Sequence, residues 1–338
     1  MGGIVTVKSI LAASARLVVV AASLFGAAPA GAGNWTFHGL EPASTYTGEF
    51  GLRYWYGKAK TGKNLYDPTG SFLVSRLTYD KLSVFSAEAY GRFDLNTGWF
   101  LKGLIGGGGF RNGTLKDEDF PPVTAPYSAT LSTLDNSFPF YAIVDVGYNV
   151  LRGPDFRVGA FVGYNYTQQV VSAQGCGQIG SNPLICGFFT IPPTVKVITQ
   201  DNNWDSLRVG LNGEVDVTRQ LKLNVDAAWL PKVWLNGTDA HWLRISNFPG
   251  DFTGPIPEDG TGWGYQLEGV LSYRLNDWLT VGVGGRYWHM QTNGFTHFEG
   301  HVNGFLASPQ PVDWKTDNYG VFFQTGLKFG PYPIISSN

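Results

Sequence analysis

Alternation of apolar and polar residues along most of the chain is the feature that most restricts its fold. Leu207, Val209 and Leu211, for example, alternate with Arg208 and Asn212. A period of two residues is the pattern of a β-strand with two different faces. In each such stretch the charges are confined to one face, and a charged face cannot point at lipid. The pattern therefore predicts strands with an apolar outer face and a polar inner face.

Ten such stretches can be counted, and the segments between them alternate sharply in length. The stretches cover residues 46–57, 71–95, 98–112, 137–151, 155–173, 203–217, 220–235, 262–275, 278–291 and 317–329. Tight turns alternate with long segments rich in Gly, Pro, Asn and Asp, which cover residues 58–70, 113–136, 174–202, 236–261 and 292–316. Short turns at one end and long loops at the other are typical of outer-membrane barrels. We therefore expect an all-β fold, a ten-stranded antiparallel transmembrane β-barrel with short periplasmic turns and long extracellular loops.

Strand number and strand length agree with this expectation. An even number of strands closes the sheet and leaves no unpaired edge in lipid. Several stretches exceed the roughly 9–11 residues that a strand needs to cross a bilayer. The barrel should therefore project above the membrane on the side of the long loops.

Composition separates the membrane barrel from its main rival, a soluble β-sandwich or lipocalin-like barrel. Alternation alone does not tell the inside from the outside, so the rival stays open on pattern. Charged residues make up 15% of the chain, against about 25% in average globular proteins. The chain also has 45 glycines, and 15% of its residues are aromatic. Few charges and many aromatic residues favour a lipid-facing band with aromatic girdles.

The N-terminal segment is typical of a secretory signal peptide. Lys8 and Arg16 supply positive charge, and an apolar run from Leu17 to Ala28 is followed by small residues. This pattern predicts a signal peptide over residues 1–32 and one mature barrel domain over residues 33–338. Removing the two cations changes the formal net charge from −2 to −4, because the segment has no acid. A negative mature chain is not the charge balance of a nucleic-acid-binding protein.

The two cysteines, Cys176 and Cys186, lie in one Gly/Pro-rich stretch. A closely spaced pair in an exported protein favours a disulfide over two free thiols. Two cysteines alone do not make a zinc site. We therefore expect a Cys176–Cys186 disulfide within a surface loop.

Two short acidic motifs follow predicted strands on the long-loop side. Asp117 and Asp119 form a D-x-D after the third stretch, and Asp239 and His241 form a D-x-H after the seventh. Each motif is weak alone, because most such acidic pairs are solvated or bind a cation such as calcium. The motifs fall on the second and fourth long loops, which can face each other across a narrow barrel. We expect the four side chains to meet at its mouth.

Together these residue types are suited to activating water. A carboxylate beside an imidazole fixes its tautomer and stabilises the imidazolium, so the histidine can act as a base near neutral pH. Two carboxylates held close together tend to share a proton. A water molecule between His241 and the Asp pair could then attack a carbonyl without a covalent nucleophile or a cofactor. The chain has no G-x-S-x-G and no H-E-x-x-H motif, so serine-hydrolase and zincin mechanisms have no support.

From about residue 51 to residue 329 the sequence resembles the omptin family, outer-membrane aspartic endopeptidases with a ten-stranded barrel. The similar segments are residues 57–60 with 66–67, 113–119, 156–164 and 234–241. The resemblance implies that Asp239 and His241 activate the water and that Asp117 and Asp119 position it from the opposite side.

The resemblance also implies acidic groups that recognise basic substrates, and lipopolysaccharide as a partner. One acid would fall in the first loop, which reads Lys60-Thr61-Gly62-Lys63, and the other at position 237, which is Gly. This chain has no acid at either place, so the family's preference for basic residues does not carry over from the resemblance, and the cleavage specificity stays open. A basic residue for lipopolysaccharide would fall near Gln168, which is neutral.

The sequence thus predicts a monomeric endopeptidase in the bacterial outer membrane, with its active site facing outside and peptides or proteins as substrates. The alternative belongs to a different class: a non-catalytic barrel, either an adhesin or a small-solute channel, that retains the omptin frame. It stays open because a fold alone does not determine a function.

Overall fold

The computed structural model describes residues 46–120, 125–182 and 184–330, and the expected signal peptide lies outside them. The strands are β1 (Tyr46–Tyr66), β2 (Leu73–Leu95), β3 (Trp99–Arg111), β4 (Thr114–Asp119), β5 (Ser128–Arg152), β6 (Phe156–Gln178), β7 (Ile191–Asp216), β8 (Leu221–His241), β9 (Ile256–Arg274), β10 (Leu279–Thr296) and β11 (Gln310–Phe329). A short 3-10 helix, η1 (Trp242–Arg244), follows β8. None of the helical residues in the described ranges forms a segment long and apolar enough to cross a bilayer.

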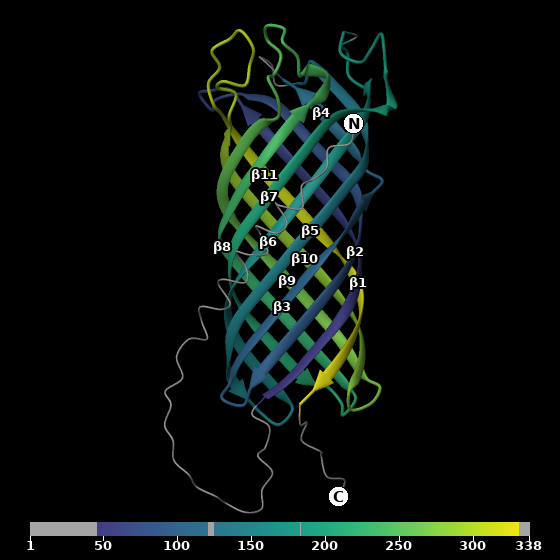
Figure 1. Cartoon of the computed structure of the whole chain (residues 1–338), viewed down its shortest axis with the longest axis vertical. Helices are drawn as coiled ribbons and strands as arrows, with labels where there is room; N and C mark the ends of the chain where they lie inside the picture. The colour runs from purple at the N-terminus through teal and green to yellow at the C-terminus, as the bar shows by residue number, and fades with distance from the viewer. Residues whose placement is uncertain (1–45, 121–124, 183, 331–338) are drawn as a thin grey trace, which may run out of the picture. The chain divides into compact units, whose positions relative to one another are not determined.

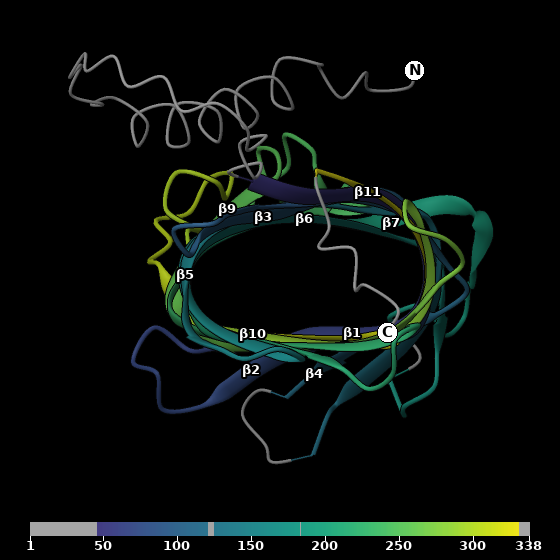
Figure 2. The ribbon, with the colours of Figure 1, turned by 90° about the horizontal axis from the view of Figure 1, so that it is seen from below.

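The strands form one closed antiparallel ring, which Figures 1 and 2 show from the side and along its axis. β1 pairs with both β2 and β11, and this double pairing closes the sheet. β3 and β4 lie one above the other between β2 and β5. They are separated at Asn112 and Gly113, whose φ angles are 57° and 113°. The eleven segments therefore occupy ten positions, and the predicted ten-stranded barrel is confirmed.

The two ends of the barrel differ in how well the strand limits agree with the prediction. At the short-turn end, observed and predicted limits differ by no more than about two residues. At the other end, the expected loops 58–70, 113–136, 174–202, 236–261 and 292–316 are wrong in extent, because strands continue into each of them. The acidic motifs therefore lie on strands: Asp117 and Asp119 on β4, Asp239 and His241 at the end of β8.

The outer and inner faces of the ring separate apolar from charged residues as the alternation predicts. Exposed outward side chains in the middle of the barrel include Leu52, Val162, Leu211, Val283 and Phe323. Inward charges pair with one another in the lower lumen. Arg286, for example, contacts Glu88 at 3.1 Å and Glu268 at 2.8 Å. A cavity of about 510 Å³ lies among such pairs and is lined by Arg53, Arg92, Asp145, Arg208, Glu214 and Glu268, among others.

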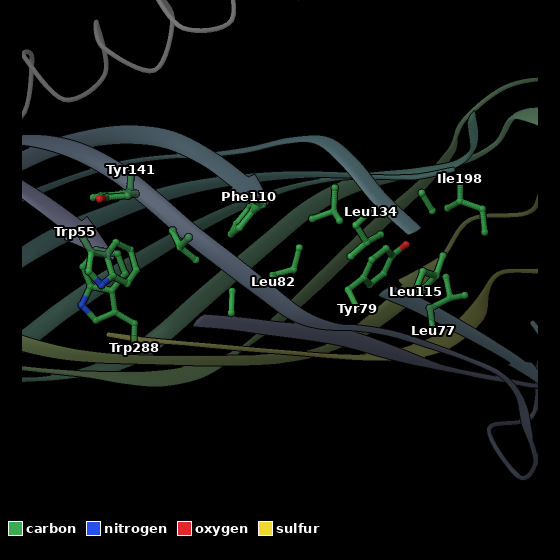
Figure 3. Close-up of a cluster of buried hydrophobic side chains, with 14 of the residues drawn as sticks. Trp55, Leu77, Tyr79, Leu82, Phe110, Leu115, Leu134, Tyr141, Ile198 and Trp288 are labelled. Carbon is green, nitrogen blue, oxygen red and sulfur yellow. The ribbon is translucent and has the colours of Figure 1, made fainter. Parts of the chain in front are cut away.

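A cluster of buried apolar side chains, among them Trp55, Tyr79, Leu115 and Ile198, lies inside the barrel (Figure 3). The rings of Trp55, Tyr141 and Trp288 come from β1, β5 and β10 and meet with centroids 5.2–6.0 Å apart. Such close packing is what a small barrel with an inward-facing core achieves. Three members of the cluster, Ile143, Val270 and Trp288, also line the lower cavity.

The predicted disulfide is confirmed. Cys176 lies near the end of β6, Cys186 lies in the connection to β7, and their Cα atoms are 5.7 Å apart. This separation is within the usual range for a bridged pair.

Candidate active site

β4 and β8 lie on opposite sides of the ring, so their long-loop ends face each other across the mouth. Three strands, β5, β6 and β7, lie between them along the shorter path around the ring. On β4 the residues Leu115, Asp117 and Asp119 share one face, and Leu115 belongs to the lumen core. Asp117 is paired with Leu77 of β2 and Thr130 of β5. The two aspartates therefore point into the mouth, directly above the apolar cluster.

Asp239 and His241 are two residues apart at the end of β8, so both side chains lie on the inner face of the strand. Nε2 of His241 lies 3.1 Å from Oδ2 of Asp239, and the Asp239 residue is only 4% exposed. The His241 ring packs edge-on against Phe252, 5.7 Å away. An aspartate and a histidine two residues apart on one strand face are neighbours by geometry, since side chains alternate between the two faces of a strand.

Lys63 reaches into the same site from β1. Its Nζ atom lies 2.5 Å from Oδ2 of Asp239 and 2.5 Å from Oε1 of Glu258 on β9. Gln200 donates a hydrogen bond of 2.8 Å to the other oxygen of Glu258. Thr296 donates one of 3.0 Å to the same oxygen that Lys63 contacts.

The sequence did not predict two residues of this site. These are Lys63, which contacts Asp239, and Glu258. Both positions fall inside the segments 58–70 and 236–261 that were expected to be loops. Had β1 been extended by alternation from Trp55 through Ala59 and Thr61, Lys63 would have fallen on the inner face. Its contacts with β8 and β9 have no signal in the local sequence.

These contacts keep the Asp239 and Lys63 side chains charged. Burial would raise the pKa of Asp239, but His241 and Lys63 outweigh burial and hold it well below its usual range. Burial would lower the pKa of Lys63, but Asp239 and Glu258 raise it to about 12. For His241, burial lowers the pKa, the Asp239 carboxylate more than reverses this, and the net pKa is raised.

The two aspartates of β4 are shifted in the opposite direction from Asp239. Burial and the charge of Asp119 raise the pKa of Asp117 to about 7, against the opposing effects of His241 and Lys63. Burial also raises the pKa of Asp119, against His241 and Arg244. The charges of His241 and Asp239 act on Asp117 across the mouth, so the fold brings both motifs into one site.

Several polar atoms around this site are buried and have no hydrogen-bond partner among the described residues. They include Oδ1 of Asp239, the hydroxyl of Tyr79 and Oε1 of Gln200. Burial and the charges of Asp239, Glu258 and Asp117 raise the pKa of Tyr79 well above its ordinary value. Buried polar groups are normally satisfied, and unsatisfied ones gathered beside a reactive pair are typical of a site that binds a ligand or water.

No group of three or more His, Cys, Asp or Glu side chains within the described ranges has the arrangement of a metal site. The mouth holds a hydrogen-bonded Asp239–His241 pair, and the charges of this pair act on Asp117, a second carboxyl whose pKa is raised to about 7. Perturbed pKa values in a cleft mark candidate functional sites.

No protein-family model matches the chain, and no curated protein matches it by sequence. Among solved structures it is similar to the outer membrane protease OmpT from Escherichia coli, with 17% identity and a TM-score of 0.63. That alignment covers 87% of this chain and 99% of OmpT. Ail of Yersinia pestis aligns with 8% identity over 83% of this chain and 99% of its own, with a TM-score of 0.28. The similarity to OmpT establishes that this chain has the fold of an outer-membrane β-barrel.

Proposed function

We propose that this protein is an endopeptidase of the bacterial outer membrane that hydrolyses peptide bonds with an activated water molecule at the long-loop mouth of the barrel. One observation carries the proposal: the charges of the hydrogen-bonded Asp239–His241 pair act on Asp117, whose pKa is raised to about 7. The similarity of the fold to a protease supports it as an analogy.

The contacts of the pair assign the proton acceptor. Nε2 of His241 faces the carboxylate of Asp239, which is held in its charged form and can only accept a hydrogen bond. Nε2 therefore carries a proton, and Nδ1 has the free lone pair. Nδ1 takes a proton from water as the water oxygen forms a bond to the scissile carbonyl carbon. The imidazolium then returns this proton to the departing nitrogen as the carbon–nitrogen bond breaks.

Asp117 and Asp119 hold the water from the opposite wall. A carboxylate there accepts a hydrogen bond from the water and so orients its oxygen toward the carbonyl. Because the pKa of Asp117 is about 7, either of its protonation states is accessible near neutral pH. This role needs no cofactor and no covalent intermediate.

The long-loop mouth faces the outside of the cell in this proposal, and one chain supplies the whole site as a monomer. Lipopolysaccharide is the proposed lipid partner, although Gln168 on the outer wall is neutral and contacts Asp201 at 3.1 Å. None of the described residues favours the alternative of an adhesin or small-solute channel. A cluster of buried apolar side chains lies inside the barrel.

The decisive experiment is to incubate the refolded protein with a mixed peptide library, in detergent with and without lipopolysaccharide. The three variants Asp239→Asn, His241→Ala and Asp117→Asn should each lower cleavage at least about a hundredfold, the usual contribution of a general base or of a group that orients the water. Heat-dependent migration on gels reports whether each barrel is folded.

Asp201→Asn is the matched control, because Asp201 lies at a similar height on the outer wall of β7. It should cleave at the wild-type rate. A folded catalytic variant with full activity would reject the mechanism, and a wild-type barrel that cleaves no peptide would reject the proposed function.

A further inference from the structure

Lys63 is a buried cation inside the mouth of the barrel, and no step of the proposed mechanism gives it a contact with the substrate or a proton to transfer. It is 5% exposed and bridges Asp239 on β8 and Glu258 on β9 from the other side of the ring. A lysine is seldom this deeply buried unless it is paired. The bridge is therefore a built feature of the site rather than a surface contact.

Residues of several strands surround the Lys63 ammonium and its partner Glu258. Glu258 is held by Gln200 and Thr296 as well as by the ammonium. The Lys63 Nζ atom also lies 5.4 Å from the centre of the Trp314 ring on β11, a distance at which a cation is attracted by an aromatic face. Without the ammonium, two buried carboxylates would face each other across the space that it occupies. Such a space would attract another cation.

The Lys63 ammonium is also adjacent to the proposed reaction centre. Oδ2 of Asp239, which Lys63 contacts, is the same oxygen that faces Nε2 of His241. A substrate cation that approached this oxygen of Asp239 would therefore come close to the ammonium, which already occupies it. Like charges in a partly desolvated site repel strongly, and such repulsion is an effective way to reject a class of ligand.

We propose that Lys63 determines the specificity of the site: its ammonium occupies the position between Asp239 and Glu258 that a cationic substrate side chain would take. The inference rests on the proposed function and names the substrate class. The site accepts peptides with an uncharged side chain next to the scissile bond and rejects arginine and lysine there.

The test uses the full-length refolded protein and fluorogenic peptides that differ only in one residue beside the cut. The residues compared are lysine, arginine, norleucine and glutamine, where norleucine matches the length of the lysine stem without its charge. The wild-type protein should cleave the norleucine peptide with a kcat/KM about tenfold or more above that of the lysine peptide, because a contact between like charges at a binding site is strongly unfavourable.

Substitution of Lys63 should reverse this preference. Lys63→Met keeps the length of the side chain and uncovers both carboxylates, so the lysine and arginine peptides should become the better substrates. The double variant Lys63→Met with Glu258→Gln should not show this new preference for lysine and arginine peptides. Lys60→Met removes an exposed, outward lysine of the same strand and should keep the wild-type ratio.

Each outcome decides the matter. A wild-type protein that is active but prefers arginine or lysine overturns the inference and leaves the proposed function standing. A folded Lys63→Met variant with the wild-type ratio overturns it too. If Lys63→Met fails to fold, Glu258→Gln replaces it. This variant removes one of the two carboxylates that neutralise the Lys63 ammonium, so the protein should reject the lysine peptide more strongly than wild type does. An unchanged ratio of norleucine to lysine cleavage would overturn the inference. A wild-type protein that cleaves none of the peptides removes the proposed function and this inference together.

Discussion

The lower lumen and the mouth of the barrel contain the same kinds of charged residue in opposite electrostatic states. In the lower lumen each central carboxylate contacts one or more cations. Glu88 and Glu268 share Arg286, and Asp145 contacts Arg208 at 2.9 Å. At the mouth, burial raises the pKa of both Asp117 and Asp119, and the charge of Asp119 adds to the effect on Asp117.

The difference separates charges that stabilise the barrel from charges that are available for chemistry. A paired buried carboxylate is satisfied and gains little from a further partner, whereas removing its cation leaves an uncompensated charge. A carboxyl that is buried beside a like charge is held away from its preferred state and responds to a proton or a ligand. Asp239 combines both situations, because it is paired with Lys63 while its Oδ1 atom has no hydrogen-bond partner.

The largest effect on stability is expected from breaking the lower network. Glu88→Gln should lower the free energy of unfolding by about 3 kcal/mol or more, because the buried guanidinium of Arg286 then lacks one of its two carboxylate partners. Urea unfolding of the folded barrel in detergent measures this. The control is Asp216→Asn, which removes a half-exposed partner of Lys222 and should change stability by no more than about 1 kcal/mol. Equal effects of the two variants would show that burial of the Glu88–Arg286 pair adds nothing to its contribution to stability.

An effect of the opposite sign is expected at the mouth. Between pH 3.8 and about 7 the folded protein keeps the Asp117 proton that the unfolded chain releases, so stability falls as the pH rises through this window. Asp117→Asn removes the carboxyl group whose ionisation destabilises the folded protein. At pH 8 it should raise the free energy of unfolding by about 2 kcal/mol, after discounting the full shift for the partial solvent contact of Asp117. At pH 4 the gain should nearly vanish.

Urea unfolding of wild type and Asp117→Asn at both pH values tests this second prediction. A variant that is less stable than wild type at pH 8 would show that Asp117 is a satisfied carboxylate like those of the lower lumen. The proposed distinction between the two regions would then be wrong.

The smallest expected effect concerns the pH dependence of cleavage. The base must be neutral, and the pKa of His241 is raised above 6.5, so kcat/KM should rise with pH through a midpoint above that value. The Lys63 ammonium opposes this rise in pKa. Lys63→Met should therefore move the acid limb to higher pH, by about one unit or less. Measured on an uncharged peptide, a shift toward lower pH would contradict the assignment of His241 as the base.

Much of the fold could be predicted from local sequence, but the accuracy depended on height in the barrel. In the middle, residues such as Leu207 and Val209 are exposed on the outer wall, and lipid requires an apolar residue at every second position. Above this band both faces of a strand can be polar. On β7, Gln200 and Asn202 face inward while Asp201 contacts Gln168 on the outside. Alternation of hydrophobicity disappears there although the strand continues, so the predicted loops were too long.

Sequence alone determined the closed ten-stranded barrel, its apolar outer face, the disulfide and the two acidic motifs, because each depends on neighbouring residues or on regular spacing. Tertiary structure decided that β4 and β8 face each other and that Lys63 meets Asp239, which is 176 residues away in the chain. Closure of the ring sets these distances. No pattern along one strand encodes which residue stands opposite it, so the charge balance of the mouth could be known only from the assembled barrel.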